Sequence, residues 1–185
     1  MSSATTVTTS LPQGAWQLDP THSSASFAVK HMVVATFRGQ FEHFDATLTV
    51  AEDGALALNG TVQVDSIVVK DENLQGHLGS PDFFDVERYP EIGFRSVDVR
   101  LDGDQVVVDG DLTIKDHTGR VQARGTLNGP AETLGGATKV GLSLQTVIDR
   151  SEFGLEWNAP LPKGGVAVAN DVTLDVDLEL ALDEG

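Results

Sequence analysis

The residues of this chain best suited to chemistry are its five histidines, because imidazole titrates near neutral pH and is the commonest metal ligand in proteins. None of them falls in an HExxH motif or in another ligand spacing that carries its own mechanism. The sequence therefore predicts no metal site, and a histidine-based, metal-dependent enzyme stays open as an alternative. The histidines stand at His22, His31, His43, His77 and His117.

Nucleophilic catalysis finds little support in the residue pattern. The chain has no cysteine and no GxSxG motif, and adjacency alone does not place Thr21, His22 and Ser23 on one side of a strand. Neither a GxxxxGK[ST] phosphate loop nor a GxGxxG motif opening a helix occurs. We therefore expect a protein without enzymatic activity and without a cofactor.

Two further residues, Arg150 and Trp157, stand close together where an alternating segment gives way to an irregular one. Arg150 either anchors the following loop by pairing with an acid such as Asp149 or Glu152, or contacts the head of a ligand. Trp157 is expected to plug one end of the fold, since large aromatic side chains fill space more often than they bind cofactors.

The elements that must position these residues are β-strands. From Val172 to Leu182 every second residue is apolar, and the residues between them are mostly Asp, Glu and Thr. A period of two over this length excludes an amphipathic helix, whose apolar residues recur at three and four. The same or a looser alternation covers residues 24–31, 37–50, 56–64, 91–101, 106–114, 120–128 and 140–148.

Eight such segments, separated by turn signals, predict an all-β fold. A closed, eight-stranded antiparallel barrel is favoured, because closure removes the exposed edges of an open sheet. A two-sheet sandwich is the alternative. Within 37–50 the apolar parity slips by one residue near Glu42 and His43, which predicts a β-bulge.

Two segments interrupt the alternation. Residues 70–90 predict a short helical or irregular flap over one barrel end. Residues 151–170, broken by two prolines and two consecutive glycines, are expected to form a loop that borders a mouth.

Length and charge indicate one acidic domain. The 185 residues carry a formal net charge of −16, and the twelve Lys and Arg form no cluster suited to successive phosphates or anionic headgroups. We therefore expect no nucleic-acid partner and only brief membrane contact. No apolar run approaches the roughly 18 residues of a membrane helix, so no stable membrane insertion is expected. Residues 1–13 lack signal-peptide features, which predicts a disordered tail before a domain at 14–185 and a cytoplasmic location.

Small residues on the apolar faces bear on whether the barrel is filled, since small barrels either pack with side chains or retain room for one ligand. Gly39, Gly60, Gly110 and Gly125 lie among apolar neighbours two residues away. They either leave a lumen or mark bends in the strands. A lumen would suit a long apolar chain, whose burial gains roughly 0.8 kcal/mol per CH₂. A filled barrel would instead serve as an interaction or stress scaffold without a ligand.

Several motifs resemble those of the YceI-like family. Residues 16–44 contain Trp-x-x-Asp-Pro-x-His-Ser, Phe-x-Val-Lys-His and Arg-Gly-x-Phe, and further matches lie at 81–85, 110–114 and 150–157. The resemblance spans about residues 15 to 180. It implies a lipocalin-like antiparallel barrel that binds a polyisoprenoid or similar amphiphile in an internal tunnel, for carriage or storage, and it implies no established reaction. It also makes a homodimer plausible.

One departure from the family bears on the ligand head. Where relatives often have Arg-Asp-x-His-Leu, this chain has Leu74-Gln75-Gly76-His77-Leu78, so a cation is lost. We therefore expect a neutral head, such as an isoprenoid quinone or a fatty amide, rather than a pyrophosphate. The expected wall and headgroup contacts are Phe27, Val29, His31, Phe37, Phe41, Phe44, His77, Leu78, Phe84, Phe94, Leu112, Ile114, Leu144 and Phe153.

Overall fold

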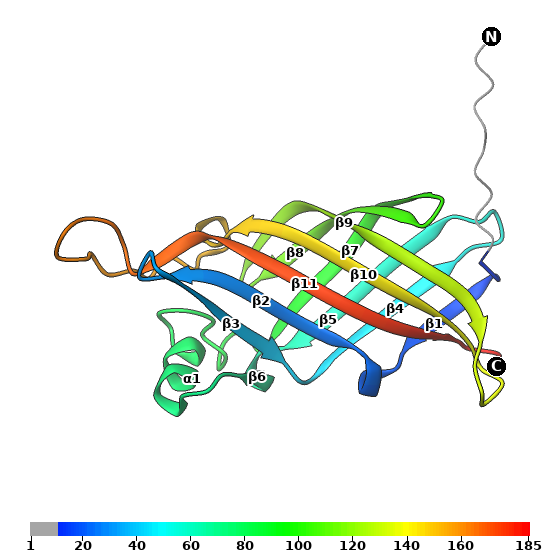
Figure 1. Cartoon of the computed structure of the whole chain (residues 1–185), viewed down its shortest axis with the longest axis horizontal. Coiled ribbons are helices and arrows are strands. Elements are labelled where there is room, and N and C mark those ends of the chain that lie inside the picture. Colours follow the sequence, from blue (N-terminus) through cyan, green and yellow to red (C-terminus); the bar gives the residue numbers. More distant parts are fainter. Residues whose placement is uncertain (1–10) are drawn as a thin grey trace, which may run out of the picture.

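The computed structural model describes residues 11–185, and in this part of the chain eleven strands and one α-helix surround a common interior (Figure 1). The helix, α1, spans Glu72–Gly79, and 3₁₀ turns lie at Pro20–His22, Val64–Ser66 and Arg150–Phe153. The strands are β1 (Gly14–Leu18), β2 (Ser24–His31), β3 (Ala35–Phe41), β4 (Phe44–Val50), β5 (Leu56–Gln63), β6 (Ile67–Val68), β7 (Glu91–Asp102), β8 (Gln105–Ile114), β9 (His117–Glu132), β10 (Thr138–Asp149) and β11 (Val168–Leu182).

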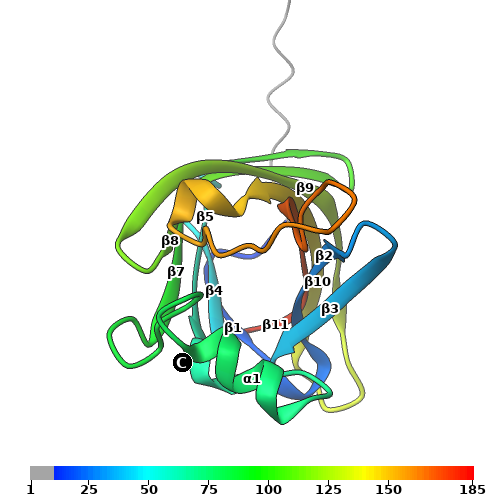
Figure 2. The ribbon, with the colours of Figure 1, turned by 90° about the vertical axis from the view of Figure 1, so that its left-hand side faces the viewer.

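Eight antiparallel strands close into a barrel, which confirms the predicted fold class (Figure 2). The order around the ring is β1-β4-β5-β7-β8-β9-β10-β11, and β11 pairs back onto β1. The long β11 pairs with β1 near its end, where Leu180 faces Leu18, and with β2 earlier, where Val176 faces Ala25. β2 then continues the sheet to β3 and β6.

The parity shift at Glu42 and His43 marks a break between two strands, so the predicted bulge within one strand is wrong. β3 pairs with β2 and β6, whereas β4 pairs with β1 and β5. The backbone N–H groups of Glu42 and His43 donate to the carbonyl and the hydroxyl of Ser66, at 3.1 and 3.0 Å. The 3₁₀ turn at Val64–Ser66 thus supplies the acceptors that a neighbouring strand would otherwise supply. At this point the chain passes from β3, which pairs with β2 and β6, to β4, which pairs with β1 and β5.

The barrel interior is packed solid at one end. Trp16 is fully buried there with Leu48, Leu142 and Leu180, and its indole N–H donates to the carbonyl of Pro12. Leu11 is buried in the same cluster. Residues 11–13 therefore belong to the folded domain rather than to the predicted tail, while residues 1–10 lie outside the described part.

The opposite end carries the predicted flap (Figure 2). The Asp71 side chain accepts the Leu74 N–H at 2.9 Å and caps α1, as short acidic side chains commonly do. Leu78 and Phe83 of the flap are buried and join a second apolar cluster. Among residues 11–185 no helix is long and apolar enough to cross a membrane.

Candidate functional site

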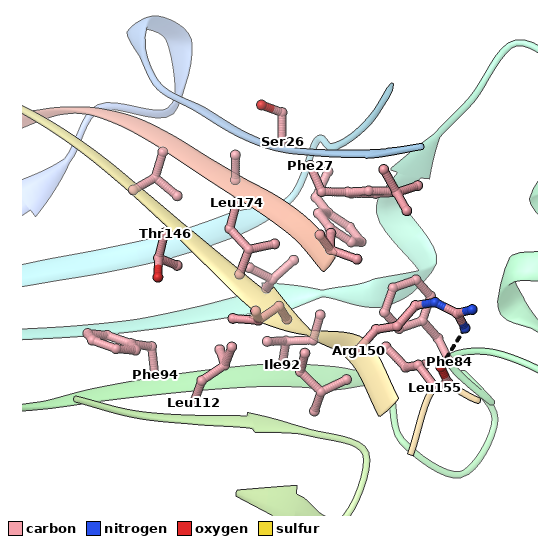
Figure 3. A pocket seen from close by; sticks show the side chains of 18 of the residues that line it. Ser26, Phe27, Phe84, Ile92, Phe94, Leu112, Thr146, Arg150, Leu155 and Leu174 are labelled. Carbon is pink, nitrogen blue, oxygen red and sulfur yellow. Dashed lines mark hydrogen bonds between the residues drawn. The ribbon is translucent and has the colours of Figure 1, made fainter. Parts of the chain in front are cut away.

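A cavity of about 540 Å³ occupies the half of the barrel beneath α1. This volume lies within the roughly 300–1,000 Å³ typical of small-molecule sites. Figure 3 shows Phe94 and Leu112 on one wall and Leu174 on the opposite one, all pointing into the same space. The walls are mainly Phe, Leu, Ile and Val, so the site suits an apolar molecule.

Two glycines explain how large rings fit along the wall. A Cβ on Gly39 would lie 2.5 Å from Cζ of Phe27, and a Cβ on Gly110 would overlap the Phe94 ring. Each ring therefore lies directly on the bare backbone of a neighbouring strand, as aromatic side chains do over sheet glycines. Gly39 and Gly110 thus make room for the rings of Phe27 and Phe94. Gly60, in contrast, lines the cavity itself.

The structure places thirteen of the fourteen predicted contact residues on the cavity lining; only Phe153 lies elsewhere. Phe153 is 2% exposed and packs on Gly119, where a Cβ would lie 3.0 Å from its Cζ. The 3₁₀ turn at Arg150–Phe153 directs this ring into the core beside the cavity. The residues that line the cavity are Phe27, Val29, His31, Phe37, Phe41, Phe44, His77, Leu78, Phe84, Phe94, Leu112, Ile114 and Leu144.

Several lining residues were missed by the sequence analysis. Ile148, Val172 and Leu174 share the alternation of strands already recognised, so extending the parity would have found them. Leu155 and Trp157 also line the cavity, but they lie in the irregular loop and carry no periodic signal. The loop after β10 does border the cavity, in agreement with the expectation for 151–170.

An aromatic cluster joins the flap to this loop. The His77 ring, from α1, lies edge-on to Trp157 with centroids 4.8 Å apart, and edge-on to Phe83 at 5.0 Å. His77 Nε2 lies 3.0 Å from a carboxylate oxygen of Asp82. His77, Phe83 and Trp157 all line the cavity, so the cluster connects the two segments that frame its open end.

Arg150 is a buried cation beside the cavity, with 3% of its surface exposed. Its Nη1 donates to the carbonyls of Leu155 and Trp157, its Nη2 to Val168 and its Nε to Ala169. A guanidinium carries five N–H groups. Four are therefore used to hold the loop, and one, on Nη2, has no acceptor among the described residues.

No carboxylate pairs with Arg150 in the described part of the chain, in contrast to the predicted ion pair. The Asp149 carboxylate instead accepts from the N–H and hydroxyl of Ser151, which lowers the pKa of Asp149. Burial lowers the pKa of Arg150, and the nearby charge of Asp149 opposes this. The result is a positive charge at the edge of an apolar cavity without a direct counter-ion.

A second polar cluster lies outside the cavity. Ligand atoms of Asp19, His22 and Glu179 lie within 4.8 Å of one another, as in a metal site. The Lys139 ammonium lies 2.9 Å from Asp19 and 3.4 Å from Glu179, so these carboxylates already share a cation. Hydrogen bonds from His22 and Lys139 hold the pKa of Asp19 far below its usual value, and Asp19 raises the pKa of Lys139. The cluster ties the corner after β1 to β10 and β11.

The YceI-like domain profile matches residues 16–180. The chain belongs to the YceI-like family. A UPF0312 protein of Staphylococcus aureus (strain USA300) is 30% identical over 169 residues, which cover 90% of this chain and 96% of that relative.

Solved structures share this YceI-like fold. BcnA of Burkholderia cenocepacia superposes with a TM-score of 0.74 and 24% identity, over 88% of this chain and 98% of its own. A YCEI protein of Campylobacter jejuni gives 0.69 and 23%, over 84% and 90%. A polyisoprenoid binding domain from Saccharophagus degradans gives 0.67 and 13%, over 91% and 98%. The family predicted from the sequence motifs is confirmed.

Proposed function

We propose that this YceI-like protein binds a polyisoprenoid or similar long-chain amphiphile in its cavity and carries or stores it. The observation that carries the proposal is the cavity of about 540 Å³ enclosed by apolar side chains inside a closed barrel. Each CH₂ of a ligand buried there would gain roughly 0.8 kcal/mol. The description of the Saccharophagus degradans neighbour as a polyisoprenoid binding domain supports this ligand class.

The head of the ligand would lie at the mouth, near Arg150 and His77. Arg150 has one N–H left after its four bonds to the loop, which matches a single carbonyl oxygen. A pyrophosphate would require several donors to satisfy its oxygens. We therefore favour a quinone or an amide head over a pyrophosphate.

The hollow interior also weighs against the two rival functions. An interaction scaffold of the filled-barrel type needs no lumen, whereas half of this barrel is hollow. A histidine-based metal enzyme needs several ligand side chains close together beside its substrate, whereas the group of this kind among the described residues, Asp19, His22 and Glu179, lies outside the cavity.

Thermal unfolding with geranylgeraniol and decylubiquinone as probes tests the proposal. A probe at about 100 times its dissociation constant should add roughly 2.7 kcal/mol to the free energy of unfolding. Ile114→Trp would fill the lumen, since Ile114 lines it, and should abolish the effect of the probe. Val147→Trp places the same ring on a 58% exposed outer position of β10 and should leave the effect intact.

Failure of both probes to shift the melting temperature of the unmodified protein, together with no saturable binding, would contradict the proposal. If Ile114→Trp does not fold, Ala123→Leu offers a smaller obstruction of the same cavity. Weaker probe binding by Ala123→Leu than by Val147→Trp would then show that the probe occupies the cavity.

A further inference from the structure

Three consecutive apolar residues are exposed at the tip of the β2–β3 hairpin. Met32, Val33 and Val34 expose 41, 67 and 86% of their surface. Exposed runs of this kind are avoided in soluble domains unless they have a function.

The backbone of this tip disfavours the residues it carries. Met32 and Val33 have φ of 51° and 68°, in the left-handed region that glycine and asparagine adopt most easily. Hairpins with such a turn usually carry Asn-Gly, and a β-branched valine there is an outlier. Apolar side chains are thus present at a tip where the backbone alone would favour polar or small residues, which points to a role for the side chains themselves.

A second hairpin, at residues 160–166, lies against the first. Its two sides meet at an isolated β-bridge between Pro160 and Val166. The N–H of Met32 donates to the carbonyl of Ala167 at 2.8 Å, and a Cβ on Gly165 would lie 3.6 Å from Val33. Figure 1 shows both hairpins extending from the same end of the barrel. Together they present a rim patch, which we define as Met32, Val33, Val34, Leu161 and Val166.

The rim patch is continuous with the cavity. Met32 lines the cavity as well as the tip, and so do its neighbours Lys30 and His31. On the other hairpin, Ala167 lines the cavity directly after Val166. An apolar chain leaving the cavity along this side would pass over the rim patch.

The two segments that carry the rim patch differ in charge from the rest of the chain. Residues 20–41 and 157–170 contain Lys30, Arg38 and Lys163 but none of the 28 acidic residues. In a chain with a formal net charge of −16, these two segments are locally cationic. An apolar tip bordered by cations is the combination that binds the surface of a lipid bilayer, where apolar side chains enter the interface and cations face the headgroups.

We propose that the rim patch docks on the surface of a lipid bilayer, so that the mouth of the cavity faces the membrane. A passenger would then move between bilayer and cavity without exposing its chain to water. The few side chains involved make the docking weak and reversible. The transfer step rests on the proposed function, whereas docking itself needs no passenger.

Flotation with vesicles tests the docking step. Phosphatidylcholine vesicles with and without phosphatidylglycerol are mixed with the full chain, and the bound fraction is measured. Val33→Asn combined with Val34→Ser removes apolar surface, and asparagine suits the left-handed backbone, so the fold should be kept. We expect vesicle binding to fall at least about fivefold. The control is Leu134→Ser, a fully exposed leucine in the β9–β10 turn, which should bind like the unmodified protein.

Three results would overturn the docking proposal. The first is no vesicle binding by the unmodified protein, and the second is equal binding by the double variant. The third is a fall in oligomer mass by light scattering with unchanged vesicle binding, which would make the patch an interface between copies of this chain. Decylubiquinone binding separates the two proposals. A double variant that still binds the probe but no longer docks supports both, whereas an unmodified protein that docks on vesicles without binding any probe overturns only the proposed function.

Discussion

Arg150 stands out at the scale of single residues, because one buried side chain holds a whole loop. Its guanidinium donates to four backbone carbonyls between Leu155 and Ala169, and it does so without a carboxylate partner. The planar fork of donors is specific to arginine. Arg150 is therefore both the clamp of the loop and the source of the single free N–H proposed to meet the ligand head.

Replacing Arg150 with methionine should destabilise the protein by about 3 kcal/mol, because four backbone carbonyls, one buried and three partly buried, lose a charged donor. Lysine should not restore the loss, since an ammonium cannot span the same acceptors. Urea unfolding measures the effect, with the exposed Arg124→Met as control. An Arg150→Met variant that unfolds at the same urea concentration as the control would show that the clamp contributes nothing.

Asp19 should make the stability of the fold depend on pH. Hydrogen bonds from His22, followed by Lys139, lower its pKa from the ordinary 3.8, and Glu179 shares the Lys139 ammonium. A carboxylate with a lowered folded pKa stabilises the protein above its unfolded pKa, and this stabilisation is lost as the pH falls toward the folded value. Asp19→Asn should therefore be less stable than the unmodified protein at pH 7, and the gap should narrow below about pH 4.

Thermal unfolding across that pH range measures the gap. The exposed Asp102→Asn serves as control and should show little gap at any pH. A gap for Asp19→Asn that stays constant down to pH 2 would mean that the lowered pKa of Asp19 does not stabilise the fold.

At the scale of elements, β9 leaves no room for a side chain at Gly125, where it runs beside β10. A Cβ on Gly125 would overlap the backbone carbonyl of Ser143, whereas a Cβ on Gly141, on the neighbouring strand, would meet nothing within 4 Å. Backbone cannot move aside as a flexible side chain can. Substitutions at these two glycines therefore distinguish a clash with the neighbouring backbone, expected only at Gly125, from the general effect of replacing a glycine, expected at both.

Gly125→Ala should destabilise the barrel by about 2 kcal/mol or more through overpacking. Gly141→Ala should change the free energy of unfolding by no more than about 0.5 kcal/mol. Chemical denaturation of the two variants provides the comparison. Equal stabilities would show that β9 and β10 can separate locally without loss.

The elements also show where sequence reasoning succeeds and where it stops. Alternation predicted most of the strands, because a period of two directly reports which face is dry, but it missed the short β1 that closes the barrel. It misread Glu42 and His43, since a slip in parity looks the same for a bulge within one strand and for a break between two. The carbonyl partners of Arg150 had no signal, because an irregular loop is positioned only by its tertiary contacts, and Trp157 was predicted as a plug of the barrel end rather than as a cavity contact.

At the scale of the whole molecule, the barrel has one solid half and one hollow half. Trp16 and Leu48 fill the first, while Phe27 and Leu112 line the second, yet all four belong to similar alternating or aromatic patterns. Periodicity shows which face of a strand points into the barrel. It does not show whether the side chains of opposite walls touch. The residue pattern therefore did not decide between a hollow and a filled barrel. The family resemblance, rather than the alternation, predicted a tunnel.

Mass spectrometry of the purified full chain, first under native conditions and then after organic extraction, shows whether the cavity holds a lipid. We expect an apolar passenger that is bound to the folded protein and released on extraction, and Ile114→Trp should purify without it. The native spectrum also tests the predicted homodimer. An unmodified protein that is empty as purified, and that stays empty after incubation with excess geranylgeraniol and decylubiquinone, would contradict lipid binding in the cavity.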